Sequence, residues 1–255
     1  MSRRSRRRRT RDLVLYVVNA DNYRRGQVAP EMRAIEASDD PAIIGIVEAT
    51  GNDFPPLPGM KRNIGSGPSR GNIGAYVARA LLGRKGLRLR WHDMKRTWPR
   101  TQGDGEHPPR SHASTKLRRV KVVVGHIPPR APGSEAARQE SSDALVRILA
   151  PWTRPGWKLL RRAQRRWHRN RPRLLLIDGN GAISELCRRA DLKPLGGKQT
   201  DAVLYGGNVE PISAGYLDEF KTPHGVVPFR GDHREVLRAE VRIPKRYLPK
   251  KRKTS

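Results

Sequence analysis

The sequence predicts a layered α/β or α+β sandwich. Several short runs are apolar at nearly every position, which is typical of strands buried on both faces. These runs alternate with segments whose apolar residues recur at helical spacing, so helices are expected to cover the sheets. A length of 255 residues allows one large domain or two small ones. Because the pattern continues from residue 12 to residue 243, we expect a single domain over that range.

The expected elements follow one another along the chain. Runs of β-branched and other apolar residues predict strands at Leu13 to Val18, Ala42 to Val47, Ile73 to Ala78, Val120 to Val124, Leu174 to Ile177, Ala202 to Tyr205 and Val236 to Val241. Helical periodicity predicts helices at Pro30 to Ala37, Ser134 to Leu149 and Ala182 to Ala190.

Four segments lack this pattern. Residues 1–11 carry seven arginines and almost nothing apolar, which predicts a disordered cationic arm, and residues 244–255 form a second basic tail. Residues 95–116 are rich in Pro, Gly, His and charge, which predicts a mobile loop inside the domain. Residues 154–173 contain basic but no acidic residues and form a basic insertion, in which a helical ridge from Arg161 to Arg169 is expected.

The charge of the chain indicates a polyanionic partner. Lys and Arg total 53 against 24 Asp and Glu, which gives a net charge of +29. This excess exceeds what solubility requires and favours nucleic acid. We expect DNA rather than RNA, although the sequence does not distinguish the two. The two tails and the Arg161 to Arg169 ridge are the expected contacts with phosphates, although simple solubilisation would explain such segments as well.

A membrane partner is not expected, because the chain contains no amphipathic or apolar segment long enough to bury itself in a bilayer. Cys187 is the single cysteine, which excludes an intrachain disulfide and a cysteine-rich zinc site. We expect a cytoplasmic, monomeric protein.

Polar residues stand at the ends of several apolar runs. Asn19, Glu48, His126 and Asp178 directly follow such runs, and Asn180 comes two residues after Asp178. In layered α/β folds functional side chains gather at strand ends, although turn chemistry alone also places Asn and Asp there. Together they suit phosphodiester hydrolysis, which needs a divalent cation, a base and donors to the phosphate. Oxygen ligands favour Mg²⁺ or Mn²⁺ over zinc.

The order of these motifs gives a family resemblance. The motifs, in order, are Val-Val-Asn19, Ile-Val-Glu48, Gly-His126-Ile-Pro-Pro, Ile-Asp178-Gly-Asn180, Thr-Asp201-Ala-Val-Leu and Gly-Asp232-His233-Arg-Glu-Val. This series resembles the endonuclease/exonuclease/phosphatase superfamily, which includes DNase I-like nucleases. The resemblance implies two packed mixed β-sheets flanked by helices. The usual Gly-Asp-x-Asn and Ser-Asp-His appear here as Ile-Asp-Gly-Asn and Gly-Asp-His, and both changes keep the chemical side chains.

The resemblance also implies a metal centre. Glu48 would be the principal ligand of Mg²⁺ or Mn²⁺, with Asn19 and Asp232 close to the ion. Asp178 would orient and activate the attacking water, and Asn180 would donate to a phosphate oxygen.

The two histidines complete the implied site. His233 would contact the phosphate or transfer a proton, held in orientation by Asp201, as carboxylates commonly hold an imidazole. His126 would lie on the leaving-group side, as a phosphate ligand or general acid.

Three functions share these features. The leading hypothesis is Mg²⁺-dependent hydrolysis of a nucleic-acid phosphodiester by an endo- or exonuclease. A phosphatase acting on a small or lipid phosphate would use the same residues, but the net charge of +29 favours the polymer. A catalytically silent nucleic-acid-binding protein that retains the fold would bind DNA with steep salt dependence and cut nothing.

Overall fold

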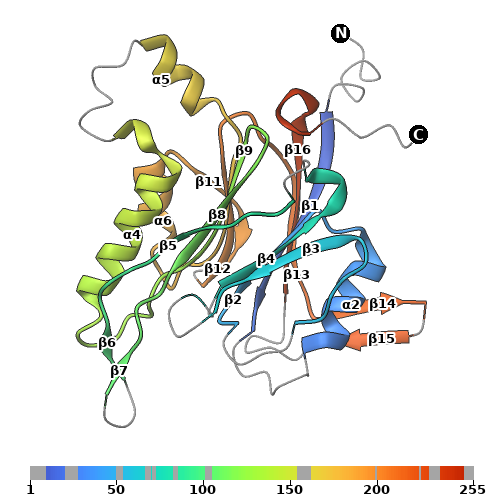
Figure 1. Cartoon of the computed structure of the whole chain (residues 1–255), viewed down its shortest axis with the longest axis horizontal. Helices are drawn as coiled ribbons and strands as arrows, with labels where there is room; N and C mark the ends of the chain where they lie inside the picture. The colour runs from blue at the N-terminus through green and yellow to red at the C-terminus, as the bar shows by residue number, and fades with distance from the viewer. Residues whose placement is uncertain are drawn as a thin grey trace.

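Two mixed sheets lie face to face in the computed structural model, which describes residues 10–20, 28–49, 54–66, 70, 73–82, 86–100, 105–153, 162–198, 200–223, 225–229 and 236–249 (Figure 1). Each sheet has six strands. In both, one central pair of strands is parallel and the other pairings are antiparallel.

The first sheet has the strand order β13-β16-β1-β2-β4-β3. Its parallel pair joins β1 to β2, with Val17 opposite Gly45. The strands of this sheet are β1 (Thr10–Asn19), β2 (Ile43–Val47), β3 (Met60–Ile64), β4 (Ile73–Ala78), β13 (Glu210–Leu217) and β16 (Val236–Pro244).

The second sheet has the order β11-β12-β10-β9-β8-β5. Its parallel pair joins β9 to β10, with Asp178 opposite His126. The strands of this sheet are β5 (Arg90–His92), β8 (His112–Leu117), β9 (Val120–His126), β10 (Arg173–Asp178), β11 (Lys193–Gly197) and β12 (Asp201–Gly206).

Helices cover the outer faces of both sheets (Figure 1). Helix α2 (Val28–Asp39) lies on the first sheet beside the hairpin of β14 (Glu219–Thr222) and β15 (Gly225–Pro228). Helices α4 (Glu135–Leu149) and α6 (Ile183–Ala190) lie on the second sheet. The smaller elements are α5 (Arg162–Arg169), β6 (Trp98–Pro99), β7 (Glu106–His107), η1 (Arg79–Leu81), η2 (Pro151–Thr153) and η4 (Lys245–Tyr247). No helix among the described residues is long and apolar enough to cross a bilayer.

Alternating side chains of the strands form three apolar layers. In β1, Leu15 and Val17 point between the sheets, where they join a core that includes Leu176 of β10. Tyr16 of the same strand points outward and packs with α2. On the second sheet the outward residues, such as Leu175, pack under α4 and α6. Burial on both faces explains why these strands are apolar at nearly every position, and it confirms the predicted sandwich of two packed mixed sheets flanked by helices.

All seven strands and three helices predicted above are present, but several boundaries differ. Thr10 and Arg11 belong to β1, where they pair with Pro244 and Ile243, so the arm expected at residues 1–11 is wrong for residues 10 and 11. These residues are ordered because the ladder between β1 and β16 continues to the ends of both strands. The tail expected at residues 244–255 is structured up to residue 249, with Tyr247 and Leu248 buried in the core. Residues 1–9 and 250–255 lie outside the described part of the chain.

The prediction of a mobile loop at residues 95–116 is wrong for much of that range. His112 and Ser114 are buried in β8, which pairs with both β9 and β5. Trp98 is buried in the small β6–β7 hairpin, where its ring stacks on His107 at 5.1 Å between centroids. The polar and Pro-rich composition conceals these strands because their burial depends on neighbours that are distant in sequence.

The two sheets pack closely at Gly45. A Cβ atom at this position would lie 2.9 Å from Leu176 Cβ, so the absence of a side chain allows β2 to pack directly on β10. Gly45 is three residues before Glu48 and Leu176 is two before Asp178. This close contact therefore sets the separation of two predicted site residues.

We expect Gly45→Ala to lower the free energy of unfolding by about 1–3 kcal/mol, because the added methyl group would overpack the space between the sheets. Gly215→Ala is the matched control, since a Cβ there meets nothing within 4 Å in exposed β13. The control should be neutral or slightly stabilising, as expected when a glycine is replaced without strain. Urea unfolding of both variants checks the prediction, and equal effects would contradict it.

Candidate active site

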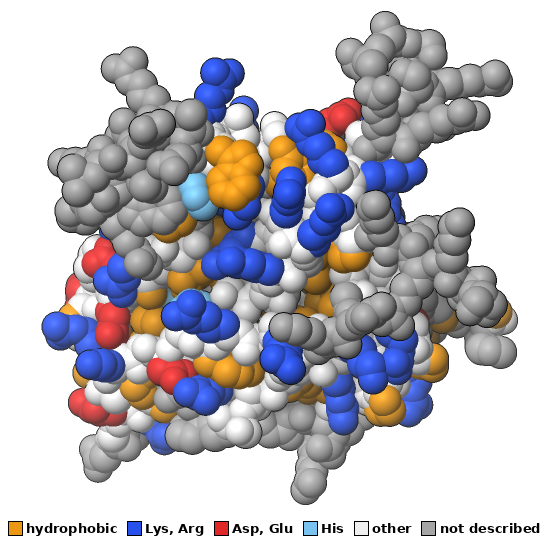
Figure 2. Space-filling view, turned by 45° about the horizontal axis from the view of Figure 1, so that its top comes forward, with side chains coloured by type: hydrophobic (Ala, Val, Ile, Leu, Met, Phe, Trp, Pro, Cys, Tyr) orange, Lys and Arg blue, Asp and Glu red, His pale blue; other side chains and the backbone are white. Residues whose placement is uncertain are grey.

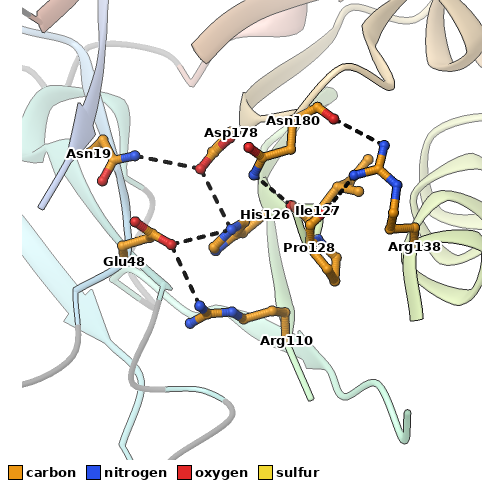
Figure 3. Close-up of polar contacts among 9 residues, drawn as sticks. All are labelled: Asn19, Glu48, Arg110, His126, Ile127, Pro128, Arg138, Asp178 and Asn180. Atoms are coloured by element: carbon orange, nitrogen blue, oxygen red, sulfur yellow. Dashed lines mark hydrogen bonds and ion pairs between the residues drawn. The ribbon is translucent and has the colours of Figure 1, made fainter. Parts of the chain in front are cut away.

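Four predicted site residues meet where the two parallel strand pairs end. Asn19 is the last residue of β1, and Glu48 directly follows β2. His126 and Asp178 are the last residues of β9 and β10. Because parallel strands end on the same side of a sheet, each sheet contributes two side chains to one site between them (Figure 3).

Glu48, His126 and Asp178 form the centre of the site. The His126 Nε2 atom lies 3.4 Å from Glu48 Oε1 and 3.5 Å from Asp178 Oδ2. One ligand atom from each residue lies within 4.8 Å of the other two, which fits a common cation. Asn19 points its amide nitrogen at the same Asp178 oxygen, at 3.5 Å (Figure 3).

The backbone at Glu48 is left-handed, with φ of 56°. Such a conformation costs a residue with a side chain about 1–2 kcal/mol. Strained backbone is often found at functional sites, where it directs a side chain. Here Glu48 is partly exposed, whereas His126 and Asp178 are buried.

Burial controls the charges of the two buried groups. It raises the pKa of the Asp178 carboxyl to about 7, and the nearby Asp201 adds to the shift. Burial also lowers the pKa of the His126 imidazole well below 6.5, and Arg110 and His112 lower it further. His126 is therefore neutral at pH 7, and its contacts with the two carboxylates are not ion pairs. A neutral imidazole can ligate a metal ion.

Asp201 and Asn180 lie beside this centre. Asp201 is buried directly opposite Asp178 in the ladder between β12 and β10. Asn180 donates a hydrogen bond of 2.8 Å from its side-chain nitrogen to the Ile127 carbonyl, which ties the turn after β10 to the end of β9. Asp232 and His233 lie outside the described residues, so their expected places near Asn19 and Asp201 stay predictions.

The structure adds two arginines that the sequence patterns did not indicate. The Arg110 guanidinium lies 3.5 Å from Glu48 Oε1, and its other side faces the Trp98 ring, 5.4 Å from the centroid. Arg138 of α4 donates to the carbonyl groups of Pro128 and Asn180, and so holds the loops after β9 and β10 together (Figure 3). The sequence patterns did not indicate either residue, because neither stands at the end of an apolar run.

Asp178→Asn is expected to stabilise the metal-free protein above pH 7. The raised pKa means that folded Asp178 holds a proton between about pH 4 and pH 7 that the unfolded chain releases. The free energy of unfolding of the wild type therefore falls as the pH rises through this window. That of Asp178→Asn does not, because the amide stays neutral. The gain should be on the order of 1–3 kcal/mol at about pH 8 and smaller at about pH 5.

Urea unfolding in chelator at both pH values measures this difference. Glu219→Gln, at an exposed position in β14, is the control and should show little change with pH. A gain for Asp178→Asn that is equal at both pH values would contradict the assignment.

Comparisons with known proteins identify the fold. No family model and no curated protein matches the sequence. Among solved structures, the AP endonuclease LMAP from Leishmania major superposes with a TM-score of 0.59 at 12% identity, over 95% of this chain and 91% of that one. TDP2 from C. elegans gives 0.55 at 14% identity, over 90% and 75% of the two chains.

A phosphatase has the same architecture. The mannosyl-6-phosphatase Bt3783 from Bacteroides thetaiotaomicron has a TM-score of 0.53 at 12% identity, over 90% of this chain and 98% of that one. An endonuclease/exonuclease/phosphatase family protein from the same organism gives 0.57 at 11% identity. At these identities the likeness concerns the fold. The chain therefore has the DNase I-like fold of endonuclease/exonuclease/phosphatase proteins, as its motifs predict.

Proposed function

We propose that the protein is a metal-dependent phosphoesterase that hydrolyses phosphodiester bonds in nucleic acid. The observation that carries this proposal is the convergence of Glu48, His126 and Asp178 from two different sheets. Buried carboxyl groups are costly unless a cation or a reaction uses them. Their placement at the ends of rigid strands, within a fold shared with nucleases and a phosphatase, supports catalysis over a purely structural role.

The two carboxyl groups at this site suit a hard divalent cation. Two ligands bound to one Mg²⁺ ion at about 2.1 Å cannot be more than about 4.2 Å apart. The two distances from His126 Nε2, 3.4 and 3.5 Å, meet that condition, and the ligand atoms of Glu48 and Asp178 lie within 4.8 Å of each other. Asp178 Oδ1 and both His126 ring nitrogens have no hydrogen-bond partner among the described residues. Glu48 would be the principal ligand of Mg²⁺ or Mn²⁺, with Asn19 and Asp232 nearby. The ion would offset the charge of the phosphate and of the attacking oxygen.

Asp178 suits the role of general base. A carboxyl group with a pKa of about 7 can accept a proton from water at neutral pH. The Asn19 amide faces its Oδ2 atom and would keep that oxygen directed into the site. The neutral His126 favours a role as ligand or orienting group over that of general acid, because its lowered pKa leaves it without a spare proton.

Arginine and amide groups would bind the phosphate. Arg110 faces the carboxylate of Glu48 and would also donate to a phosphate oxygen, since a guanidinium carries several N–H donors. Asn180 donates from its amide nitrogen to Ile127 and also hydrogen-bonds Asp178, and it would donate to a phosphate oxygen of the bound substrate. Arg138 fixes the position of this residue through its backbone carbonyl. His233 and its expected partner Asp201 would complete the phosphate site.

Nucleic acid is the substrate that the charge favours. A net charge of +29 is far larger than a small phosphate ester requires, and it attracts a polymer with one charge per nucleotide.

The test is nicking of supercoiled plasmid with Mg²⁺, with and without chelator. We expect Glu48→Ala and Asp178→Asn each to lower the rate by roughly 100-fold or more, because one removes a metal ligand and the other the base. Glu219→Gln removes an exposed carboxylate and should cut as fast as the wild type.

The other outcomes select the other functions. Plasmid binding without nicking, under several divalent ions, would overturn the enzyme and favour a silent nucleic-acid-binding protein. Release of phosphate from small esters, with the plasmid intact, would instead support a phosphatase.

A further inference from the structure

A basic surface lies at the end of the sheets opposite the active site. Asp178 ends β10 at the active site, whereas Arg173 begins it, so the two ends are roughly 17 Å apart at about 3.3 Å per residue. Helix α5 lies on the Arg173 side (Figure 1). We call this surface the distal face and define it by its exposed or partly exposed cations, namely Lys116, Arg118, Arg119, Arg166, Arg169, Arg171, Lys193, Lys245 and Arg246.

These cations come from separate segments that the backbone locks together. In the β8–β9 turn, the Arg119 backbone nitrogen donates to the Tyr247 carbonyl of η4 at 3.1 Å, and Arg118 donates to the Leu248 carbonyl at 3.1 Å. After α5, the Asn170 carbonyl accepts from the Asn208 nitrogen at 3.0 Å. These bonds hold the β8–β9 turn against η4, and the end of α5 against the segment after β12.

Few acidic groups neutralise the distal face. Asp191 lies 3.1 Å from Arg169 and 3.8 Å from Arg173, and Glu210 lies 3.3 Å from Arg242. Both carboxylates are thus already matched by arginines. Figure 2 shows Lys and Arg side chains spread across this end, with few acidic side chains among them. The remaining cations leave a strongly positive surface.

The distal face contains a groove and an exposed aromatic ring. The groove has a volume of about 1350 Å³, and Trp152, Arg166, Arg169, Lys193 and Tyr205 are among its lining residues. Trp167 of α5 is 48% exposed, and the Arg171 guanidinium lies 3.3 Å from its ring centroid. Basic grooves beside exposed aromatic rings are typical of surfaces that follow a nucleic-acid backbone.

We propose that the distal face binds the sugar-phosphate backbone of nucleic acid at a site separate from the active site. A polymer would then be held at both ends of the sheets. This inference rests on the proposed function for its substrate class, but it does not require catalysis.

A matched pair of triple variants tests this proposal. Lys116→Gln, Arg119→Gln and Arg166→Gln together remove three exposed charges from the distal face. Arg33→Gln, Lys61→Gln and Lys221→Gln remove three exposed charges from α2, β3 and β14, which are outside the distal face. Both variants change the net charge equally, so only the position of the charges differs. Anisotropy of a short fluorescent DNA duplex in chelator measures binding without cutting.

Salt dependence gives the expected size of the effect. When salt rises from about 50 to about 200 mM, the affinity of both proteins for DNA should fall. If two or three phosphate contacts are removed, the factor by which affinity falls should be roughly 10- to 40-fold smaller for the distal variant than for the wild type. The control variant should keep the wild-type salt dependence. Equal changes in both variants, or none in either, would overturn the proposal. Loss of binding to phosphatidylserine vesicles alone, with DNA binding intact, would also overturn it.

Nicking assays separate this inference from the proposed function. The distal variant should need several-fold more plasmid for half-maximal rate, with the maximal rate unchanged, since its active site is intact. If no form of the protein nicks DNA, the proposed function fails and the binding measurement still decides the distal face. If the distal variant has a lower maximal rate of nicking but needs the same plasmid concentration for half-maximal rate, the distal face is part of the catalytic site and the inference is wrong.

Discussion

The close packing of β2 on β10 is the contact on which the rest of the site depends. Gly45 leaves no room for a side chain opposite Leu176, so the two parallel strand pairs meet near their carboxyl ends. Glu48 and Asp178 then come from different sheets yet approach the same imidazole nitrogen of His126. The rigid core therefore positions the side chains at the centre of the site, and the loops contribute further side chains around it. Such preorganisation is what electrostatic catalysis requires, because fixed groups need not reorganise during the reaction.

The same packing explains the unusual electrostatics of the centre. Asp178 and Asp201 are buried opposite each other on paired strands, which raises the pKa of Asp178. His126 is buried and neutral for the same reason. Without a cation the burial of these groups opposes folding, whereas the same closely spaced groups would bind a cation favourably.

Much of this arrangement could be predicted from the sequence. Strands buried on both faces are apolar throughout, so β1, β2, β9 and β10 and the polar residues at their ends were evident. The edge strand β13 and the polar strand β8 were missed because local composition does not record which neighbour covers a strand. Arg110 was missed because the hairpin containing Trp98 brings it to Glu48. The adjacency of Asp178 and Asp201 depends on strand register, which only the fold determines.

Direct titration with Mn²⁺, followed by the electron paramagnetic resonance of the free ion, tests the central claim without any substrate. The account predicts that the wild-type protein binds the ion at the site formed by Glu48, His126 and Asp178, and that Glu48→Gln weakens this binding by roughly 10-fold or more, since a neutral amide is a poorer ligand than a carboxylate. Identical binding curves for the wild type and Glu48→Gln would contradict it.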